Sequence, residues 1–207
     1  ILEILPGANC GNCGYAGCSA YANALAGGGV KPNLCPACSG AAAVKIAEIL
    51  GVDAEESEKT VARVRCSGDF QNTALKYIYD GPSDCHSAAK LGGGEKMCPF
   101  ACLGFGSCVK VCRFDALSVK DGIAVIDEEK CVGCGSCVKE CPKNVIALMP
   151  QKSKYAVACQ SAEKGKITRQ NCEVGCIGCG ICAKNCSKDA ITVENNIAVI
   201  NQEKCVS

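Results

Sequence analysis

Large aromatic side chains are scarce in this sequence of 207 residues, which has no tryptophan, four phenylalanines and five tyrosines. A core built mainly from aromatic rings is therefore not expected. No apolar run of about 18 residues occurs, so the printed sequence contains no transmembrane helix. Positive and negative charges almost cancel, at a formal net charge of +1. Because nothing in this balance attracts a polyanion, binding to nucleic acid is not expected.

The motifs of enzymes that transform organic substrates are also missing. The sequence shows no catalytic triad, no P-loop and no G-x-G-x-x-G nucleotide fingerprint. Its glycine runs at 27–29 and 92–94 do not stand between a strand and a helix, as a phosphate-binding loop requires. We therefore expect no substrate-transforming active site within this chain.

Cysteine, in contrast, is abundant, with 22 residues or more than a tenth of the chain. Such a composition is typical of disulfide scaffolds and of metal proteins. The cysteines are grouped at metal-ligand spacings, and metal ligation requires reduced thiols, which favours a cytosolic type of compartment. Because an unfolded chain holds no preformed metal site, bound clusters are expected to supply much of the folding free energy.

The strongest motif runs from Cys131 to Pro142 with the spacing C-x2-C-x2-C-x3-C-P. Three thiolates on so short a loop reach one cubane, and the fourth reaches a second cubane in two-cluster ferredoxins. The sequence therefore predicts a [4Fe–4S] cluster on Cys131, Cys134 and Cys137, with Cys112 as the crossing fourth ligand. Disulfides satisfy thiols in pairs, and zinc sites usually combine two separated pairs, so both fit this run poorly.

A second motif, C-x2-C-x4-C, lies near the N-terminus and is followed by a Cys-Pro pair. It predicts one [4Fe–4S] cluster, with zinc as the alternative, on Cys10, Cys13, Cys18 and Cys35. Cys38 is left over, and we interpret it as a small buried residue rather than an alternative ligand. Helices are expected over 19–26 and over 39–50, each ended by glycine.

The segment that follows is expected to pack between cluster domains. Residues 52–64 have a helix-like pattern, with Asp53 as the N-cap and acidic residues near the positive end of the helix dipole. Residues 61–66 then favour a strand. We interpret Cys66, at the end of that strand, as a core cysteine rather than a ligand. His86, the only histidine, is interpreted as an exposed or capping residue rather than a ligand.

A shift of 74 residues lays the second half of the chain over the first. Six pairs of cysteines coincide: Cys85 and Cys159, Cys98 and Cys172, Cys102 and Cys176, Cys108 and Cys182, Cys112 and Cys186, Cys131 and Cys205. Six coincidences identify a tandem repeat. Each repeat is expected to contain a cysteine loop, a short helix, two short strands joined by a tight turn at 120–122 or 194–196, and a second cysteine loop.

The first cysteine loop of the first repeat departs from the pattern, because Phe105 replaces its middle cysteine. Cys98 is the nearest substitute, so a second cluster is predicted on Cys98, Cys102, Cys108 and Cys141. Two alternatives stay open: Cys85 in place of Cys98, and a three-iron cluster. Against Cys98 stands its repeat mate Cys172, which is present beside a complete loop.

A further cluster is predicted on the complete loop of the second repeat, which holds Cys176, Cys179 and Cys182. Its fourth ligand is expected beyond Ser207, and Cys186 and Cys205 are assigned to another cluster that also needs later residues. Five cysteines stay unassigned: Cys38, Cys66, Cys85, Cys159 and Cys172. The sequence thus predicts at least three complete or nearly complete [4Fe–4S] clusters and one or two incomplete ones.

These patterns predict an α+β chain of small iron–sulfur domains. The expected parts are an N-terminal helical [4Fe–4S] domain at 1–52, a connecting segment at 53–84, a two-cluster bacterial-ferredoxin-like module at 85–158 and a truncated second module at 159–207. Residues 151–170 carry five positive charges against one negative charge. We interpret them as a solvated face between the modules rather than a docking patch for an acidic ferredoxin.

The N-terminal motif resembles the iron–sulfur domain shared by B subunits of the Rnf electron-transport complex and the large subunit of the corrinoid iron–sulfur protein. The order of the parts, and the run from Cys98 to Cys108 without a middle cysteine, are similar to anaerobe-type Rnf B subunits over essentially the whole chain. The resemblance implies a component of a membrane-bound ferredoxin:NAD⁺ oxidoreductase that translocates ions.

By this resemblance the chain is an electron-transfer subunit at the cytoplasmic face of the cell membrane. It is expected to exchange electrons with soluble ferredoxin and to pass them to the membrane redox subunits of the complex. Members of the family carry an N-terminal membrane anchor, so the chain is interpreted as a fragment that lacks this anchor and its own C-terminal end. The alternative is a polyferredoxin-type subunit of another, soluble oxidoreductase.

Overall fold

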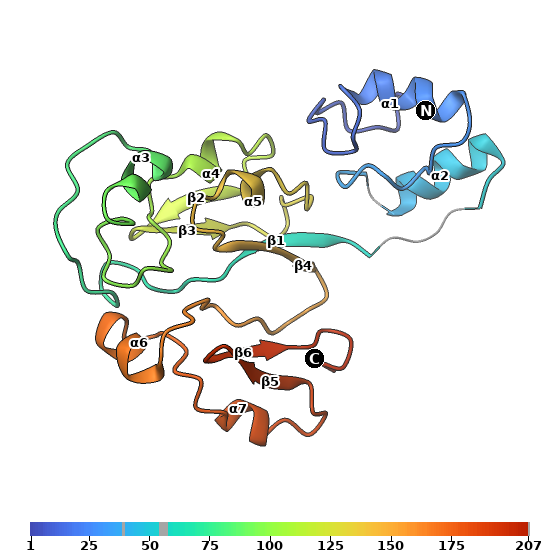
Figure 1. Ribbon diagram of the computed structural model, residues 1–207. Coiled ribbons are helices and arrows are strands. Elements are labelled where there is room, and N and C mark those ends of the chain that lie inside the picture. The colour runs from blue at the N-terminus through green and yellow to red at the C-terminus, as the bar shows by residue number, and fades with distance from the viewer. Residues whose placement is uncertain (39, 54–57, 207) are drawn as a thin grey trace.

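The chain folds into three parts, which Figure 1 shows in separate regions of the molecule. The computed structural model describes residues 1–38, 40–53 and 58–206. Within these residues, a helical unit is followed by a central part with two two-stranded sheets and by a last part with a third such sheet.

The N-terminal part is built from two helices, α1 (Cys18–Ala26) and α2 (Gly40–Leu50). Tyr21 of α1 and Ile46 of α2 belong to one buried cluster, which also includes Cys35. Both helices expected from the sequence are confirmed, and Ser39, the expected first residue of the second, lies outside the described residues.

The helix expected over 52–64 is wrong. The described residues of this range contain no helix, and strand β1 occupies Thr60–Val64, while residues 54–57 lie outside the described part. The β-branched residues of β1 favour extended backbone, and the strand finds its partner far along the chain. The strand expected over 61–66 is confirmed for residues 61–64.

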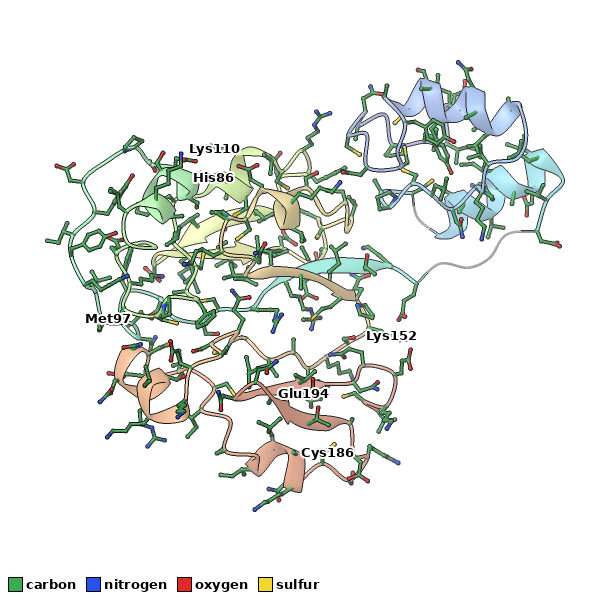
Figure 2. The ribbon with its side chains drawn as sticks, in the orientation of Figure 1. His86, Met97, Lys110, Lys152, Cys186 and Glu194 are labelled. Carbon is green, nitrogen blue, oxygen red and sulfur yellow. The ribbon has the colours of Figure 1, made fainter. Side chains whose placement is uncertain are left out.

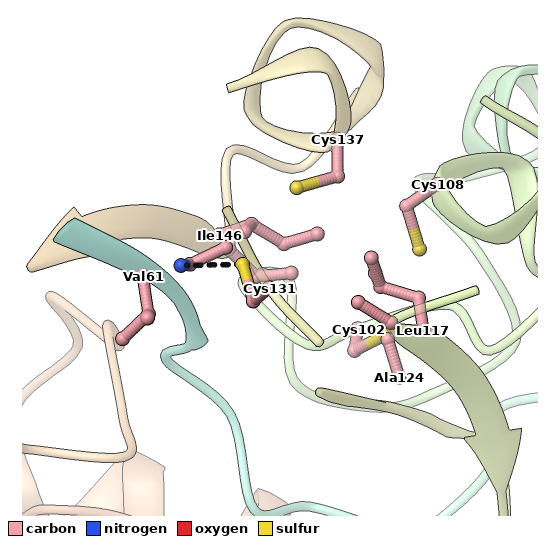
Figure 3. Packing of buried hydrophobic residues seen from close by; sticks show 11 residues of the cluster. Val61, Cys102, Cys108, Leu117, Ala124, Cys131, Cys137 and Ile146 are labelled. Atoms are coloured by element: carbon pink, nitrogen blue, oxygen red, sulfur yellow. Dashed lines mark hydrogen bonds between the residues drawn. The ribbon is translucent and has the colours of Figure 1, made fainter. Parts of the chain in front are cut away.

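β1 pairs with a strand from the end of the first repeat. The partner is β4 (Ile146–Pro150), which runs antiparallel with Val61 opposite Met149. This sheet therefore joins the expected connecting segment at 53–84, which contains β1, to the expected module at 85–158, which contains β4. Figure 3 shows Val61 and Ile146 in the central core, among cysteines that come from two loops.

Two hairpins recur at the repeat spacing of 74 residues. The first pairs β2 (Leu117–Lys120) with β3 (Ile123–Ile126), and the second pairs β5 (Ile191–Glu194) with β6 (Ile197–Ile200). The two central residues of each turn have positive φ, at 49° and 76° for Asp121 and Gly122 and at 48° and 64° for Asn195 and Asn196. Paired left-handed residues form the type I′ turn that suits a twisted hairpin. Both expected hairpins are confirmed.

A short helix follows each of three cysteine loops: α4 (Ser107–Lys110), α5 (Ser136–Glu140) and α7 (Ile181–Lys184). α4 and α7 coincide at the repeat spacing. Upstream the repeats diverge, because the first has α3 (Cys85–Lys90) and the second has α6 (Gly165–Asn171). The structural repeat is therefore close only downstream of the pair Cys102 and Cys176.

Candidate metal centres

Within the described residues, three cavities are each lined by four cysteine side chains. The Cys131 site contains Cys112, Cys131, Cys134 and Cys137. The Cys102 site contains Cys85, Cys102, Cys108 and Cys141. The Cys172 site contains Cys66, Cys98, Cys159 and Cys172. The cavities are similar in size, at about 290, 350 and 340 Å³ with their openings to solvent included.

The Cys131 site combines the four cysteines that the sequence predicts for it. Cys131 and Cys134 come from the loop before α5, Cys137 lies in the first turn of α5, and Cys112 follows α4. The backbone N–H of Ala62 in β1 donates a hydrogen bond of 3.3 Å to Cys131 Sγ, which Figure 3 shows as a dashed line. The loop lies directly against β1, since a Cβ on Gly133 would stand 2.3 Å from the carbonyl oxygen of Thr60. Glycine is therefore required where the loop meets this strand.

The Cys102 site contains Cys85 where the sequence first suggests Cys98. This is the alternative that the missing middle cysteine at Phe105 leaves open. Cys141 reaches the cavity from the neighbouring loop, as the crossover rule predicts. The ring of Phe105 instead packs 4.9 Å from the ring of Tyr79, measured between centroids.

A hydrogen-bond network at the start of α3 holds Cys85 in place. Asp84 is the N-cap, and its Oδ2 accepts from the backbone N–H of Ser87 at 2.8 Å. Its Oδ1 accepts from the hydroxyl of Ser107 at 2.9 Å, and that hydroxyl accepts from the N–H of Cys85 at 2.9 Å. The N–H of Ser87 and the hydroxyl of Ser107 together lower the pKa of Asp84 to about 2. The carboxylate therefore stays charged and ties α3 to the buried Ser107.

Cys98 lines the third cavity together with Cys66, Cys159 and Cys172, which the sequence motifs assign to no cluster. The four cysteines come from four separate segments, and no spacing in the sequence marks them as one group. The only signal is that Cys159 and Cys172 recur at the repeat spacing from Cys85 and Cys98. Cys85 and Cys98 themselves line two different cavities, so this recurrence does not show that Cys159 and Cys172 share one.

In the N-terminal part, cysteines gather around Tyr21. Cys13, Cys18, Cys35 and Cys38 all pack in its cluster. The hydroxyl of Tyr21 donates to the carbonyl of Lys31 at 2.7 Å and accepts from the N–H of Leu34 at 3.2 Å, which fixes the segment that carries Cys35. A hydrogen bond from the Cys38 thiol lowers the pKa of Cys35 to about 6 and raises that of Cys38.

The remaining N-terminal cysteine, Cys10, is half-buried in the loop before α1. Cys38 is half-buried too, and its hydrogen bond with Cys35 raises its pKa. Cys35 and Cys38 also line one shared hollow. The choice between them as fourth ligand therefore stays a prediction in favour of Cys35.

The second repeat copies the local geometry of the first around its cysteines. The N–H of Ala198 donates to Cys176 Sγ at 3.5 Å, and that of Ala190 donates to Cys186 Sγ at 3.4 Å. The N–H of Cys205 donates to the carbonyl of Asn201 at 3.1 Å, as that of Cys131 does to Asp127 at 3.0 Å. Cys179 and Cys182 are exposed. Figure 2 shows Cys186 near the end of α7.

The only histidine lies outside the cavities. His86 is exposed, and its Nε2 stands 3.0 Å from Glu140 Oε1. Figure 2 shows it on the outer surface of the central part, which agrees with its interpretation as an exposed residue. In the basic stretch at 151–170, Lys152 is also exposed and forms an ion pair of 2.8 Å with Glu58.

The donor set of these cavities fits a cluster of iron and sulfide. Soft thiolates select iron–sulfur clusters, zinc and copper(I). Among the described residues, no three His, Cys, Asp or Glu side chains converge on one point as a single ion requires, and the cysteines surround cavities instead. Burial raises the pKa of Cys137 and of Cys108 to about 12, and the other cysteines of each site add to the rise. Metal binding reverses this preference, because positive metal stabilises thiolates.

Comparison with known families supports this chemistry. A family model described as "Putative Fe-S cluster" matches residues 5–37. A second, described as "4Fe-4S binding domain", matches residues 124–147 and so includes the loop of Cys131, Cys134 and Cys137. The two matches include the C-x2-C-x4-C motif that begins at Cys10 and the cysteine run from Cys131 to Pro142.

Three relatives, all B subunits of ion-translocating complexes, match nearly the whole chain. The chain is 45% identical over 206 residues to the one from the Na⁺-translocating ferredoxin:NAD⁺ oxidoreductase complex of Acetobacterium woodii, covering 99% of this chain and 62% of that protein. It is 49% identical to the proton-translocating counterpart of Clostridium ljungdahlii, covering 100% and 74%. It is 42% identical to the one from the ion-translocating oxidoreductase complex of Methanosarcina acetivorans, covering 100% and 79%.

The chain belongs to this family of Rnf B subunits. It spans less than two thirds of the A. woodii protein, at 62% of that length. In the described part of this Rnf chain, no helix has the length and apolar character needed to cross a membrane.

Proposed function

We propose that this chain is the electron-relay part of an Rnf B subunit. It passes electrons through several [4Fe–4S] clusters between soluble ferredoxin and the membrane redox subunits of an ion-translocating ferredoxin:NAD⁺ oxidoreductase complex. The observation that carries the proposal is the exchange of cysteines between two loops. Cys112 follows the first loop but lines the Cys131 site, and Cys141 follows the second but lines the Cys102 site. Two-cluster ferredoxins place their fourth ligands in this way.

The ligand sets of this proposal follow the cavities where these are complete. Cys112 joins the loop of Cys131, and Cys85 completes the Cys102 site with Cys102, Cys108 and Cys141. The N-terminal cluster takes Cys10, Cys13, Cys18 and Cys35. In the second repeat, Cys176, Cys179 and Cys182 hold one cluster, and Cys186 and Cys205 contribute to another. A bound [4Fe–4S] cluster accepts and releases single electrons at a potential that charge, hydrogen bonds and exposure adjust.

The repeated elements support a tandem of ferredoxin-like modules. β1, β4 and the hairpin β2–β3 frame the first module, and the hairpin β5–β6 recurs in the second. The same amide-to-sulfur bond recurs as well, because the N–H of Ala124 donates to Cys102 as that of Ala198 donates to Cys176. Such bonds favour the thiolate form and influence the reduction potential of a bound cluster.

The protein's own part in the relay is to bury two sites in one core. Cys102, Cys108, Cys131 and Cys137 all belong to the same buried cluster, with Leu117 and Ile146. Cys137 of the Cys131 site adds to the rise in the pKa of Cys108, although the two cysteines line different cavities. Apolar packing of this kind excludes water and holds the sites at a fixed separation, which suits electron transfer without rearrangement.

We also infer the partners and the location of this chain from the names of its relatives. The A. woodii and C. ljungdahlii relatives are named as parts of ferredoxin:NAD⁺ oxidoreductase complexes. We assign soluble ferredoxin as the electron partner of this chain and the other components of the complex as its neighbours. We place it at the cytoplasmic face of the membrane, where soluble ferredoxin is available.

The test is anaerobic purification, iron and sulfide analysis, and reduction by ferredoxin. The chain is expected to contain iron and acid-labile sulfide in equal amounts and to show low-temperature EPR signals of [4Fe–4S] clusters after ferredoxin reduces it. Cys131→Ala is expected to remove about one cluster, roughly 4 iron atoms per chain. Zinc without sulfide, or loaded clusters that reduced ferredoxin leaves oxidised, would contradict the proposal.

A further inference from the structure

Four segments far apart in the sequence converge on the Cys172 site. Cys66 follows β1, Cys98 precedes the first cysteine loop, Cys159 lies after β4, and Cys172 is the C-cap of α6. An isolated antiparallel bridge between Thr73 and Cys172 brings the connecting segment to the second repeat. The site therefore lies where the connecting segment, the first repeat and the second repeat meet, and neither repeat contains it alone.

Backbone hydrogen bonds on both sides of that bridge hold the two segments together. The N–H of Glu173 donates to the carbonyl of Asn72 at 2.9 Å, and the N–H of Ala74 donates to the carbonyl of Asn171 at 3.3 Å. Asn171, Cys172 and Thr73 are all buried. Main-chain contacts to the segment around Thr73 thus determine the position of Cys172. The side chains of these two residues, which are 99 positions apart in the sequence, are also in contact, at 3.7 Å between Thr73 Oγ1 and Cys172 Sγ.

Each of the four sulfur atoms accepts a hydrogen bond. The N–H of Cys102 donates to Cys66 Sγ at 3.4 Å, and that of Ser161 donates to Cys159 Sγ at 3.4 Å. The hydroxyl of Thr73 donates to Cys172 Sγ at 3.7 Å. The N–H of Phe100 donates to Cys98. Donors aimed at sulfur stabilise thiolates, and they are the outer contacts that surround metal-bound cysteines.

Glycine makes room beside these sulfur atoms. A Cβ on Gly68 would stand 2.3 Å from Thr73 Oγ1 and 3.3 Å from Cys172 Sγ, and one on Gly175 would stand 2.6 Å from Thr168 Cγ2. The cavity, at about 340 Å³, matches the Cys102 cavity of about 350 Å³. A cavity of similar size that is also lined by four thiols suits the same kind of occupant.

A buried cation stands between the Cys172 and Cys102 sites. Lys96 is 1% exposed, and its Nζ donates at 2.7 Å to the carbonyl of Gly68 and at 2.7 Å to that of Gly122. Gly68 lines the Cys172 cavity, and Gly122 packs against Gly104 of the Cys102 cavity. No ion pair joins Lys96 to a carboxylate within the part of the chain that the structure describes. A buried charge needs a compensating one, and a cubane held by four thiolates is a net anion.

We propose that Cys66, Cys98, Cys159 and Cys172 together bind an additional [4Fe–4S] cluster. It stands between the Cys102 site and the second repeat, since Cys66 accepts its hydrogen bond from the backbone of Cys102, and Cys172 lies four residues before Cys176. The inference rests on the proposed function in taking an iron–sulfur cluster as the occupant. It explains why Cys172 is present although the loop of Cys176 is complete.

The first test compares the iron and sulfide content of alanine variants of the full chain, purified without oxygen. Cys172→Ala and Cys159→Ala are each expected to lose roughly 4 iron atoms per chain. The double variant Cys98→Ala with Cys172→Ala should lose no more than Cys172→Ala alone, because both residues hold the same cluster. Cys85→Ala with Cys172→Ala should lose roughly twice as much. Val174→Ala, in the same cavity, is the matched control and should lose none.

A second measurement needs no variant and so does not depend on folding. In the loaded protein, all four thiols should resist an alkylating reagent, as read by mass spectrometry, and should become reactive together when the clusters are removed. Alkylation of Cys159 or Cys172 while Cys137 stays protected would overturn the inference and leave the proposed function intact. A finding of one zinc ion per chain that is lost in Cys172→Ala would also overturn the inference and leave the proposed function intact. A chain without any iron–sulfur cluster would overturn both.

Discussion

The side-chain amide of Asn12 donates a hydrogen bond of 3.0 Å to the hydroxyl of Ser136. Asn12 precedes Cys13 of the N-terminal part, and Ser136 lies between Cys134 and Cys137 of the Cys131 site, with its Oγ 3.6 Å from Cys134 Sγ. One hydrogen bond therefore joins the N-terminal cysteine group to the central sites. Arg113 adds two more, to the carbonyls of Ala8 and Asn9, at 3.0 and 2.9 Å.

Asn12→Ala is expected to loosen this junction without removing a cluster. A typical hydrogen bond contributes about 1 kcal/mol, so the docked population should fall about fivefold relative to the undocked one. Iron content should stay unchanged, and rapid-mixing spectroscopy should show slower electron transfer between the N-terminal cluster and the others. Asn23→Ala, on an exposed part of α1, is the matched control. Loss of iron in Asn12→Ala would mean that the contact supports a cluster and not the junction.

The proposed exchange of ligands between the two central loops predicts that two cysteines each affect the cluster of the neighbouring loop. Cys141→Ala should damage the cluster of the Cys102 site, although Cys141 follows the loop of Cys131. Cys112→Ala should damage the cluster of the Cys131 site. Each variant should lose roughly 4 iron atoms, and EPR of each should retain the signal that the other loses. If Cys141→Ala removed only the signal that Cys131→Ala removes, the crossover would be refuted.

The lowered pKa of Asp84 predicts how its contribution to the stability of the Cys102 site depends on pH. Because the pKa of Asp84 is lowered from 3.8 to about 2, its charged form stabilises the folded protein at pH values above about 4, and this contribution is lost as the pH falls from there through about 2. Asp84→Asn should lower the urea concentration at which the Cys102 cluster is lost, by an amount that stays constant from pH 8 to pH 5. A difference that changes within this range would contradict the stated pKa. Asp80→Asn, on an exposed residue of the same segment, serves as the control.

Lys96 is expected to raise the reduction potentials of the clusters on either side of it. Lys96→Met removes a buried positive charge, so electron uptake becomes less favourable and the potentials become more negative. A change of about 1.4 kcal/mol, within the range for one charge near a partly buried group, equals about 59 mV for one electron. An EPR-monitored redox titration measures it. Lys90→Met removes an exposed charge on α3 and should shift the potentials by much less. Equal shifts in both variants would rule out a specific role for Lys96.

Much of the secondary structure follows from local sequence. Asp121-Gly122 and Asn195-Asn196 tolerate positive φ, so both hairpin turns are predictable from residue type alone. The helix expected over 52–64 fails where β1 forms, because a strand is stabilised by its partner, and β4 lies more than 80 residues away in the sequence. The strand propensity of residues 60–64 alone does not reveal that β4 is the partner of β1.

The sequence by itself indicated iron–sulfur chemistry, because most of its 22 cysteines stand at ligand spacings, and it predicted the crossing pair Cys112 and Cys141 and the duplicated plan. Only the tertiary structure decided which distant thiols share a cavity. It placed Cys85 with Cys102, and it gathered Cys66, Cys98, Cys159 and Cys172 into one site. The physical reason is that spacing along the chain reveals ligands that one loop presents together. Ligands from separate segments meet only after long-range backbone pairing, such as that between Thr73 and Cys172, has formed.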